Sequence, residues 1–344
     1  MTSPYIIRPV RESDLESFKE LRDLAGAGFT SLSVDDATLA KRIGASSETY
    51  AANIPEPGAN QRYMLALEHR ETGVLAGVAG VKACVGDVPP FYNFRVLKIS
   101  QASAAANRRY DMDVLILVNE FTGCSEVGSL FVRPEHRAHG VGRMLAQARY
   151  LLMAADKHRF AAEVVSELRG VVDAHGVSPF WEHLGRHFFQ MSFAEADKLS
   201  ASTDNQFILD LMPKYPIYAD LLPEAARAVI GKCHPQGEGA LKLLQWEGFR
   251  YERVVDIFDG GPLVTAPRDS IRTFRESRRL EVRASDALAA PVRALVARPS
   301  IAAFRCAGGE IDLRDGVAYA TRATLDAADL QSGDTALIWS GDAV

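Results

Sequence analysis

Residues 137–142, Arg-Ala-His-Gly-Val-Gly, lie between a short apolar run at 130–132 and a long segment with helical periodicity at 141–155. In that segment, apolar side chains recur at the i, i+3, i+4 spacing of one buried helix face. Glycines allow backbone angles and a close approach that other residues resist. A strand, this turn and a helix therefore predict an anion cradle, in which the helix N-terminus offers unpaired N–H groups and a positive dipole end to a phosphate.

A glycine pair between a strand and a helix is often only a tight turn, so the surroundings of this one matter. The spacing differs from the dinucleotide pattern Gly-x-Gly-x-x-Gly and from a P-loop, because no Gly-Lys-Ser/Thr follows. Cationic side chains gather here, in a chain whose formal net charge is -5: His136, Arg137, His139, Arg143 and Arg149. Arg-x-x-Gly-x-Gly after a strand resembles the acyl-CoA-binding motif of the GCN5-related N-acyltransferases.

Composition excludes several other classes of protein. With 344 residues, the chain is long enough for two domains or for one domain with an extension, and 47% apolar residues are ordinary for a globular protein. No apolar run approaches the roughly 20 residues that a membrane helix needs, and no basic excess suggests nucleic-acid binding. Four widely spaced cysteines without a Cys-x-x-Cys pair predict neither a zinc site nor a disulfide framework. We therefore expect a cytoplasmic protein with no metal.

The order of predicted elements indicates the fold class. Strands are predicted at 6–10, 63–67, 74–81, 114–118, 127–132 and 164–168, and helices at 15–24, 34–43, after residue 140 and from 178. This order resembles the GCN5-related N-acyltransferase fold, a mixed α/β (α+β) class. Similar phrases at 180–186 and 244–249 predict a second related half, and valine-rich runs with glycine turns predict a small mostly-β C-terminal appendage. The expected domains are 1–200 for acyl-CoA binding, 201–265 for a second transferase-like segment with the catalytic histidine, and 266–344 for the β region.

Seven phrases carry a narrower resemblance. They are Gly-Phe-Thr-Ser-Leu at 28–32, Phe-Thr-Gly-Cys-Ser-Glu at 121–126, Glu-Leu-Arg-Gly-Val at 167–171, His-Gly-Val-Ser-Pro-Phe-Trp at 175–181, Leu-Met-Pro-Lys-Tyr-Pro-Ile-Tyr at 211–218, Val-Ile-Gly-Lys-Cys-His-Pro-Gln at 229–236 and Asp-Ile-Phe-Asp-Gly-Gly-Pro at 256–262. Together they resemble the bacterial arginine N-succinyltransferases. The resemblance implies transfer of succinyl from succinyl-CoA to the α-amine of L-arginine, giving N2-succinylarginine and CoA in the first step of this route of arginine catabolism. Some relatives also accept ornithine and work as paired subunits, which leaves a homo- or hetero-oligomer open.

By this resemblance, His234 matches the catalytic proton donor and Leu130 matches a contact of succinyl-CoA. An α-ammonium must lose a proton before it attacks, and the CoA thiolate must gain one; imidazole, with a pKa of about 6.5, can serve either step. Leu130 would act through its backbone, because the strand splays from its neighbour in this fold and leaves amides free to pair with the pantetheine arm. The predicted acyl-CoA site comprises Leu130, Val132, Arg137, Gly140 and Gly142. Succinyl-CoA is a co-substrate, so no permanently bound cofactor is expected.

The substrates impose further requirements on charge. A guanidinium prefers a carboxylate in fork geometry, for which Glu126 and Glu167 are candidates. The carboxylates of arginine and of the succinyl group need cations, and Arg169 and Lys232 are the hypotheses for them.

Other readings of the chain remain. It could be an ornithine-preferring succinyltransferase subunit, or a general amine N-acetyltransferase that uses acetyl-CoA, since the cradle recognises CoA and not the acyl group. Cys233 could be a covalent nucleophile next to His234, although neighbouring side chains of an extended backbone point opposite ways. A CoA-binding partner subunit without activity is the non-enzyme alternative.

Overall fold

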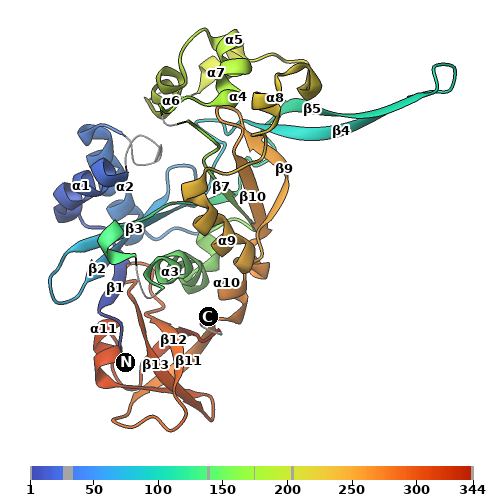
Figure 1. Ribbon diagram of the computed structural model, residues 1–344. Helices are drawn as coiled ribbons and strands as arrows, with labels where there is room; N and C mark the ends of the chain where they lie inside the picture. Colours follow the sequence, from blue (N-terminus) through green and yellow to red (C-terminus); the bar gives the residue numbers. More distant parts are fainter. Residues whose placement is uncertain (1, 26–33, 138–139, 174, 203–204, 342–344) are drawn as a thin grey trace.

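The computed structural model in Figure 1 describes residues 2–25, 34–137, 140–173, 175–202 and 205–341. The phrase at 28–32 and residues 138–139 of the cradle lie outside the described residues. The strands form one continuous hydrogen-bonded sheet in the order β12-β15-β11-β14-β13-β1-β2-β3-β6-β7-β10-β9-β4-β5-β8. No helix among the described residues is long and apolar enough to span a bilayer.

The N-terminal elements follow the sequence prediction closely. They are β1 (Tyr5–Pro9), α1 (Leu15–Ala25), α2 (Asp36–Ala51), β2 (Arg62–His69) and β3 (Leu75–Lys82). Helix α2 is longer than predicted, and it begins where the Asp35 side chain accepts a hydrogen bond from the backbone N–H of Thr38. Both helices pack their apolar faces on β2 and β3, where Phe18, Leu39 and Ile43 are buried.

The middle of the chain contains the predicted strand–cradle–helix–strand unit. Its elements are β4 (Asn93–Ser103), β5 (Arg108–Val118), β6 (Ser125–Val132), α3 (Val141–Ala155) and β7 (Glu163–Glu167). Strand β4 was not predicted, because its distal half is exposed on both faces and so lacks apolar alternation. Figure 1 shows β4 and β5 projecting from the body as a two-stranded ribbon.

Helix α3 lies deeper than a one-sided amphipathic helix would. Every residue from 144 to 153 is buried, because α3 contacts β3 and β6 on one side and α10, β12 and β15 on the other. Arg149 is therefore 3% exposed, and its guanidinium lies over the Tyr150 ring, with the guanidinium carbon 5.6 Å from the ring centroid. The expected place of Arg149 in a basic cluster around the cradle is wrong.

The second half of the chain continues the same sheet. It contributes α4 (Pro179–His183), α5 (Gly185–Phe189), α6 (Phe193–Ser202), α7 (Gln206–Leu211), β8 (Ile217–Tyr218), α8 (Glu224–Arg227), α9 (Glu238–Glu247), β9 (Arg250–Asp256), β10 (Pro262–Pro267) and α10 (Arg272–Glu276). Ser178 caps α4 as predicted, accepting a 3.2 Å hydrogen bond from the N–H of Trp181. Strands β9 and β10 lie between β4 and β7, so they complete the central sheet.

The C-terminal region is mostly β-structure, as predicted. Its elements are β11 (Arg278–Ala284), β12 (Val292–Ala297), β13 (Cys306–Arg314), β14 (Val317–Ala320), α11 (Arg322–Ala327) and β15 (Thr335–Trp339). The pairing of β12 with both β15 and β13 closes these strands into a small barrel. The barrel joins the rest of the sheet through β13 and β1.

Candidate active site

Strands β6 and β7 part in the middle of the central sheet. Their parallel pairing covers Ser125 with Val164 and Glu126 with Val165. Beyond that point the Ser166 hydroxyl, and not a backbone amide, donates to the carbonyl oxygen of Val127 at 2.8 Å. Strand β6 runs on to Val132 while β7 ends at Glu167, so the backbone around Leu130 flanks the opening between them.

The predicted cradle lies at the end of β6. Gly140 has a φ of 76°, a left-handed conformation that favours glycine, and it directly precedes the 15-residue helix α3. Apart from the adjoining backbone, no atom of the described residues lies within 4 Å of where a Cβ would stand at Gly140 or Gly142. Arg137 is exposed, and its Nε donates to the carbonyl oxygen of Val132 at 2.9 Å. The described part of the cradle is thus open to a ligand.

His234 is held by its backbone to segment 168–170, which follows β7. Gly170 and Cys233 form an antiparallel bridge, and the N–H of His234 donates to the carbonyl oxygen of Arg169 at 2.8 Å. The imidazole Nδ1 accepts from the N–H of Gln236 at 3.2 Å, so neutral His234 carries its proton at Nε2. Partial burial lowers the pKa of His234, and the Arg169 guanidinium adds to this while Asp259 opposes it.

The turn between β9 and β10 packs tightly against the same segment, 168–170. The carboxylate of Asp259 accepts from the N–H of Gly170 at 2.7 Å and from the N–H of Gly261 at 2.8 Å. A Cβ at Gly261 would stand 2.2 Å from the carbonyl oxygen of Leu168, which no real packing permits. The phrases at 167–171, 229–236 and 256–262, which are far apart in the sequence, therefore meet in one rigid unit.

A pocket of about 210 Å³ opens on this unit. Three of the predicted substrate residues line it together: Glu126, Glu167 and Arg169. Lys232 is exposed and is absent from the described lining of the pocket. Sequence reasoning missed Asp256 and Asp259, although both lie in a phrase that carried the family resemblance.

The two predicted glutamates have different surroundings. Glu126 forms an ion pair with Lys82 at 2.5 Å. Glu167 accepts a long 3.4 Å hydrogen bond from the amide of Asn93. Burial raises the pKa of Glu167 well above its usual value, and the neighbouring carboxyl groups of Asp256 and Glu126 raise it further.

Cys233 does not have the surroundings of a nucleophile. Its side chain packs against the main hydrophobic core. Burial raises the pKa of the Cys233 thiol, whereas a reactive cysteine needs a lowered pKa. This geometry opposes the covalent alternative.

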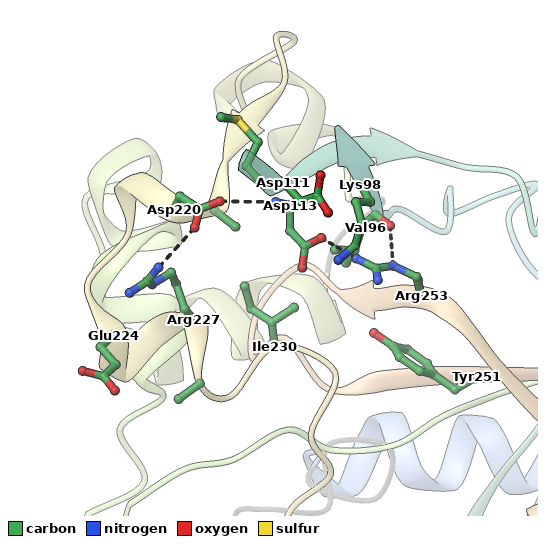
Figure 2. A pocket seen from close by; sticks show the side chains of 13 residues that line it. Val96, Lys98, Asp111, Asp113, Asp220, Glu224, Arg227, Ile230, Tyr251 and Arg253 are labelled. Carbon is green, nitrogen blue, oxygen red and sulfur yellow. Dashed lines mark hydrogen bonds and ion pairs between the residues drawn. The ribbon is translucent and has the colours of Figure 1, made fainter. Parts of the chain in front are cut away.

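A larger pocket lies elsewhere, at the base of the β4–β5 ribbon (Figure 2). Its volume is about 520 Å³, and none of the predicted site residues lines it. Two ion pairs line it, Asp113 with Arg253 at 2.6 Å and Asp220 with Arg227 at 3.2 Å, and Lys98, Asp111 and Glu224 also lie in its wall. In the ranges that the structure describes, no group of His, Cys, Asp and Glu side chains is arranged to hold a metal ion.

Comparison with known proteins decides the family. A family model described as the arginine N-succinyltransferase beta subunit matches residues 5–273. The chain belongs to the arginine N-succinyltransferase family. Arginine N-succinyltransferases of Salmonella typhi and of Salmonella paratyphi B are each 41% identical over 330 residues, covering 96% of this chain and 95% of the relative.

A solved structure agrees with this assignment. The arginine/ornithine succinyltransferase subunit AI from Pseudomonas aeruginosa is 30% identical, has a TM-score of 0.87 and is matched over 98% of both chains. The predicted family, its acyltransferase class and the fold class are confirmed. The roles of individual site residues and the limits of the domains remain predictions.

Proposed function

We propose that this chain transfers succinyl from succinyl-CoA to the α-amine of L-arginine and releases N2-succinylarginine and CoA. One observation carries the proposal. Segment 168–170, which follows β7, contacts both His234 and the turn that lines a carboxyl-rich pocket beside the opening between β6 and β7. This arrangement supports a site in which an acyl donor, a proton-carrying imidazole and a cationic amine would meet.

The acyl-CoA site follows β6 into α3. The pyrophosphate would bind the N-terminal amides of α3 at Gly140 and Gly142, with the exposed Arg137 beside it. The pantetheine arm would pair with the β6 backbone from Leu130 to Val132, as an added strand does. Amides freed by the splay would also stabilise the oxyanion of the tetrahedral intermediate.

The reaction proceeds by direct attack. The neutral α-amine forms a bond to the thioester carbon, the carbon–sulfur bond breaks, and one proton passes from nitrogen to sulfur. His234 gives its Nε2 proton to the departing sulfur and takes the proton of the attacking nitrogen in its place, so the imidazole is neutral before and after the transfer, while its Nδ1 stays engaged by the N–H of Gln236. The lowered pKa of His234 keeps the imidazole neutral near pH 7.

In the acceptor site, Glu167 is the better candidate for the guanidinium, because Glu126 already has Lys82 as its partner. Arg169, which lines the same pocket, would receive a substrate carboxylate. Lys232 is kept as the second candidate cation. Assembly of this chain with a second copy or with a related chain is part of the proposal, since the Pseudomonas relative is named as a subunit.

A purified-protein assay tests the function. Release of CoA from succinyl-CoA is measured with arginine, ornithine and lysine in parallel, and again with acetyl-CoA as donor. We expect the highest kcat/KM for succinyl-CoA with arginine, and almost no turnover in a His234→Ala variant. Ornithine is the second candidate acceptor, because the Pseudomonas relative is named for both amino acids. A preference for acetyl-CoA would contradict the proposal.

A further inference from the structure

Glu167, Asp256 and Asp259 form a carboxyl array in the wall of the 210 Å³ pocket. Glu167 ends β7, Asp256 ends β9, and Asp259 lies in the turn that joins β9 to β10. Asp259 is only 6% exposed, and its two oxygens are engaged by backbone N–H groups. Asp256 accepts from the N–H groups of Phe258 and Asp259 at 2.7 and 2.8 Å. These bonds fix both aspartates in place.

Among the described residues, the array has hydrogen-bond donors but no ion-pair partner. Lys82, the cation whose field reaches Glu167, is itself paired with Glu126. Within the described ranges, no lysine, arginine or histidine side chain forms an ion pair with the three carboxyl groups. Asn93, which is 0% exposed, directs its amide nitrogen at Glu167, and its Oδ1 finds no partner in the part of the chain that the structure describes. Buried carboxylates are normally paired, so this arrangement points to a positively charged ligand with several N–H groups.

We infer that Glu167, Asp256 and Asp259 bind the guanidinium of the amino-acid substrate, and that the array releases a proton to solvent as the cation enters. The inference rests on the proposed function and names the acceptor site within it. No bond of the substrate changes in this step: a proton held between carboxyl groups leaves, and the guanidinium takes over its neutralising charge.

The guanidinium fits this array better than the α-ammonium does. It carries five N–H donors in a planar fork and keeps its charge at any ordinary pH. The α-ammonium has to lose a proton before it attacks the thioester, whereas carboxylates in contact with it would hold that proton in place. Binding of the distal cation by the array leaves the amine free to become neutral.

The raised pKa values in the array are consistent with the loss of a proton when the cation binds. Burial raises the pKa of Glu167 and of Asp259 well above the usual values, and the adjacent carboxyl of Asp256 raises both further. The other charged groups that face the array are Glu126, Lys82, Arg169 and His234. Because the free array holds a proton that the complex does not, the affinity for arginine rises with pH until the free array is fully ionised.

Calorimetry on the full chain without succinyl-CoA tests the inference. Arginine binding is measured in buffers of different ionisation enthalpy, so that the dependence of the heat on the buffer counts the protons released. We expect about one proton per arginine. N2-acetylarginine, which keeps the guanidinium but has no free α-amine, should release a proton as arginine does. Norvaline, which has the α-ammonium and no distal cation, should release none.

Variants link the proton to the array. Glu167→Gln should weaken arginine binding by about 10- to 100-fold and remove the proton release. Asp256→Asn should act in the same direction, and norvaline binding should stay unchanged in both. Asp220→Asn, in the larger pocket, is the matched control and should bind arginine as the unaltered chain does. Thermal unfolding of each variant shows that it is folded.

Specific results would overturn the inference. Arginine binding without proton exchange would refute it, and so would equal proton release with norvaline, which would assign the array to the α-ammonium. Proton release on arginine binding together with no succinyl transfer would leave the array standing and refute the proposed function instead. If Glu167→Gln left succinyl transfer to arginine unchanged, the proposed function would stand and the role of the array would be refuted.

Discussion

The two pockets of this molecule differ in how their charges are matched. The larger one, about 520 Å³ beneath the β4–β5 ribbon, holds aspartates that already pair with Arg253 and Arg227. The smaller one, about 210 Å³, holds Glu167, Asp256 and Asp259, which form no ion pair within the described residues. A paired charge is satisfied by the fold, whereas an unpaired buried charge needs a ligand. We therefore use unmatched charge, and not volume, to choose the pocket that we propose for the substrate.

The backbone explains this difference. In β9, Arg253 has a φ of 62° at an irregularity of the strand, and its side chain reaches Asp113 across to β5. A few residues later, the turn after β9 directs Asp256 and Asp259 toward the end of β7, where burial raises their pKa values. Strand β9 thus supplies Arg253 to an ion pair in the larger pocket. Its end and the turn after it supply Asp256 and Asp259, which form no ion pair in the described residues, to the smaller pocket.

The largest effect is expected at His234, which lies beside the smaller pocket. We expect His234→Ala to lower kcat by about 10²- to 10⁴-fold, because the departing thiolate loses its proton donor. His187→Ala, which alters an exposed histidine of α5, is the matched control and should leave kcat unchanged. Steady-state turnover of succinyl-CoA with saturating arginine measures both. A loss below ten-fold in His234→Ala would remove the histidine from the chemistry.

The sequence predicted the parts of this site that are built from adjacent residues better than the parts that are built from distant segments. The cradle and α3 follow each other directly, so glycine spacing and helical periodicity were enough to predict them. The position of His234 depends on Gly170 and Asp259, which lie far from it in the chain. Spacing alone could not predict its role as a proton donor, which came from the family resemblance. Asp256 and Asp259 were missed because carboxylates at a strand end or in a turn ordinarily face solvent, and only the packing of Gly261 on Leu168 shows that this turn is buried.

The two glutamates of the smaller pocket sharpen the comparison further. Glu167→Gln should raise the KM for arginine by about 10- to 100-fold, because it removes an unpaired charge from the guanidinium site. Glu126→Gln should have a smaller effect, since Lys82 already pairs with this carboxylate. Initial rates at varied arginine, with fixed succinyl-CoA, measure both. An arginine KM unchanged in Glu126→Gln would remove Glu126 as a guanidinium ligand, and a larger effect there than at Glu167 would reverse the assignment.

The next test concerns the turn between β9 and β10, which carries Asp259. Gly261→Ala should lower the free energy of unfolding by about 1–3 kcal/mol, because its Cβ would stand 2.2 Å from the carbonyl oxygen of Leu168. It should also reduce turnover, since the new Cβ would displace segment 168–170, whose Arg169 carbonyl oxygen accepts the backbone N–H of His234. Gly239→Ala, in α9 with no atom within 4 Å of the new Cβ, is the matched control and should stabilise the chain slightly. Urea unfolding compares the two, and equal stabilities would show that the turn is loosely packed.

The smallest effect is expected in the larger pocket. Arg227→Ala removes the partner of Asp220 in a pair whose side chains are 42% and 47% exposed, so it should cost less than about 1 kcal/mol of stability. Because we propose the smaller pocket for the substrate, the KM for arginine and kcat should both stay at the values of the unaltered chain. Urea unfolding and steady-state kinetics on the same preparation measure the two quantities. A marked rise in the arginine KM would mean that the larger pocket takes part in binding, and matched charge would then no longer separate the two regions.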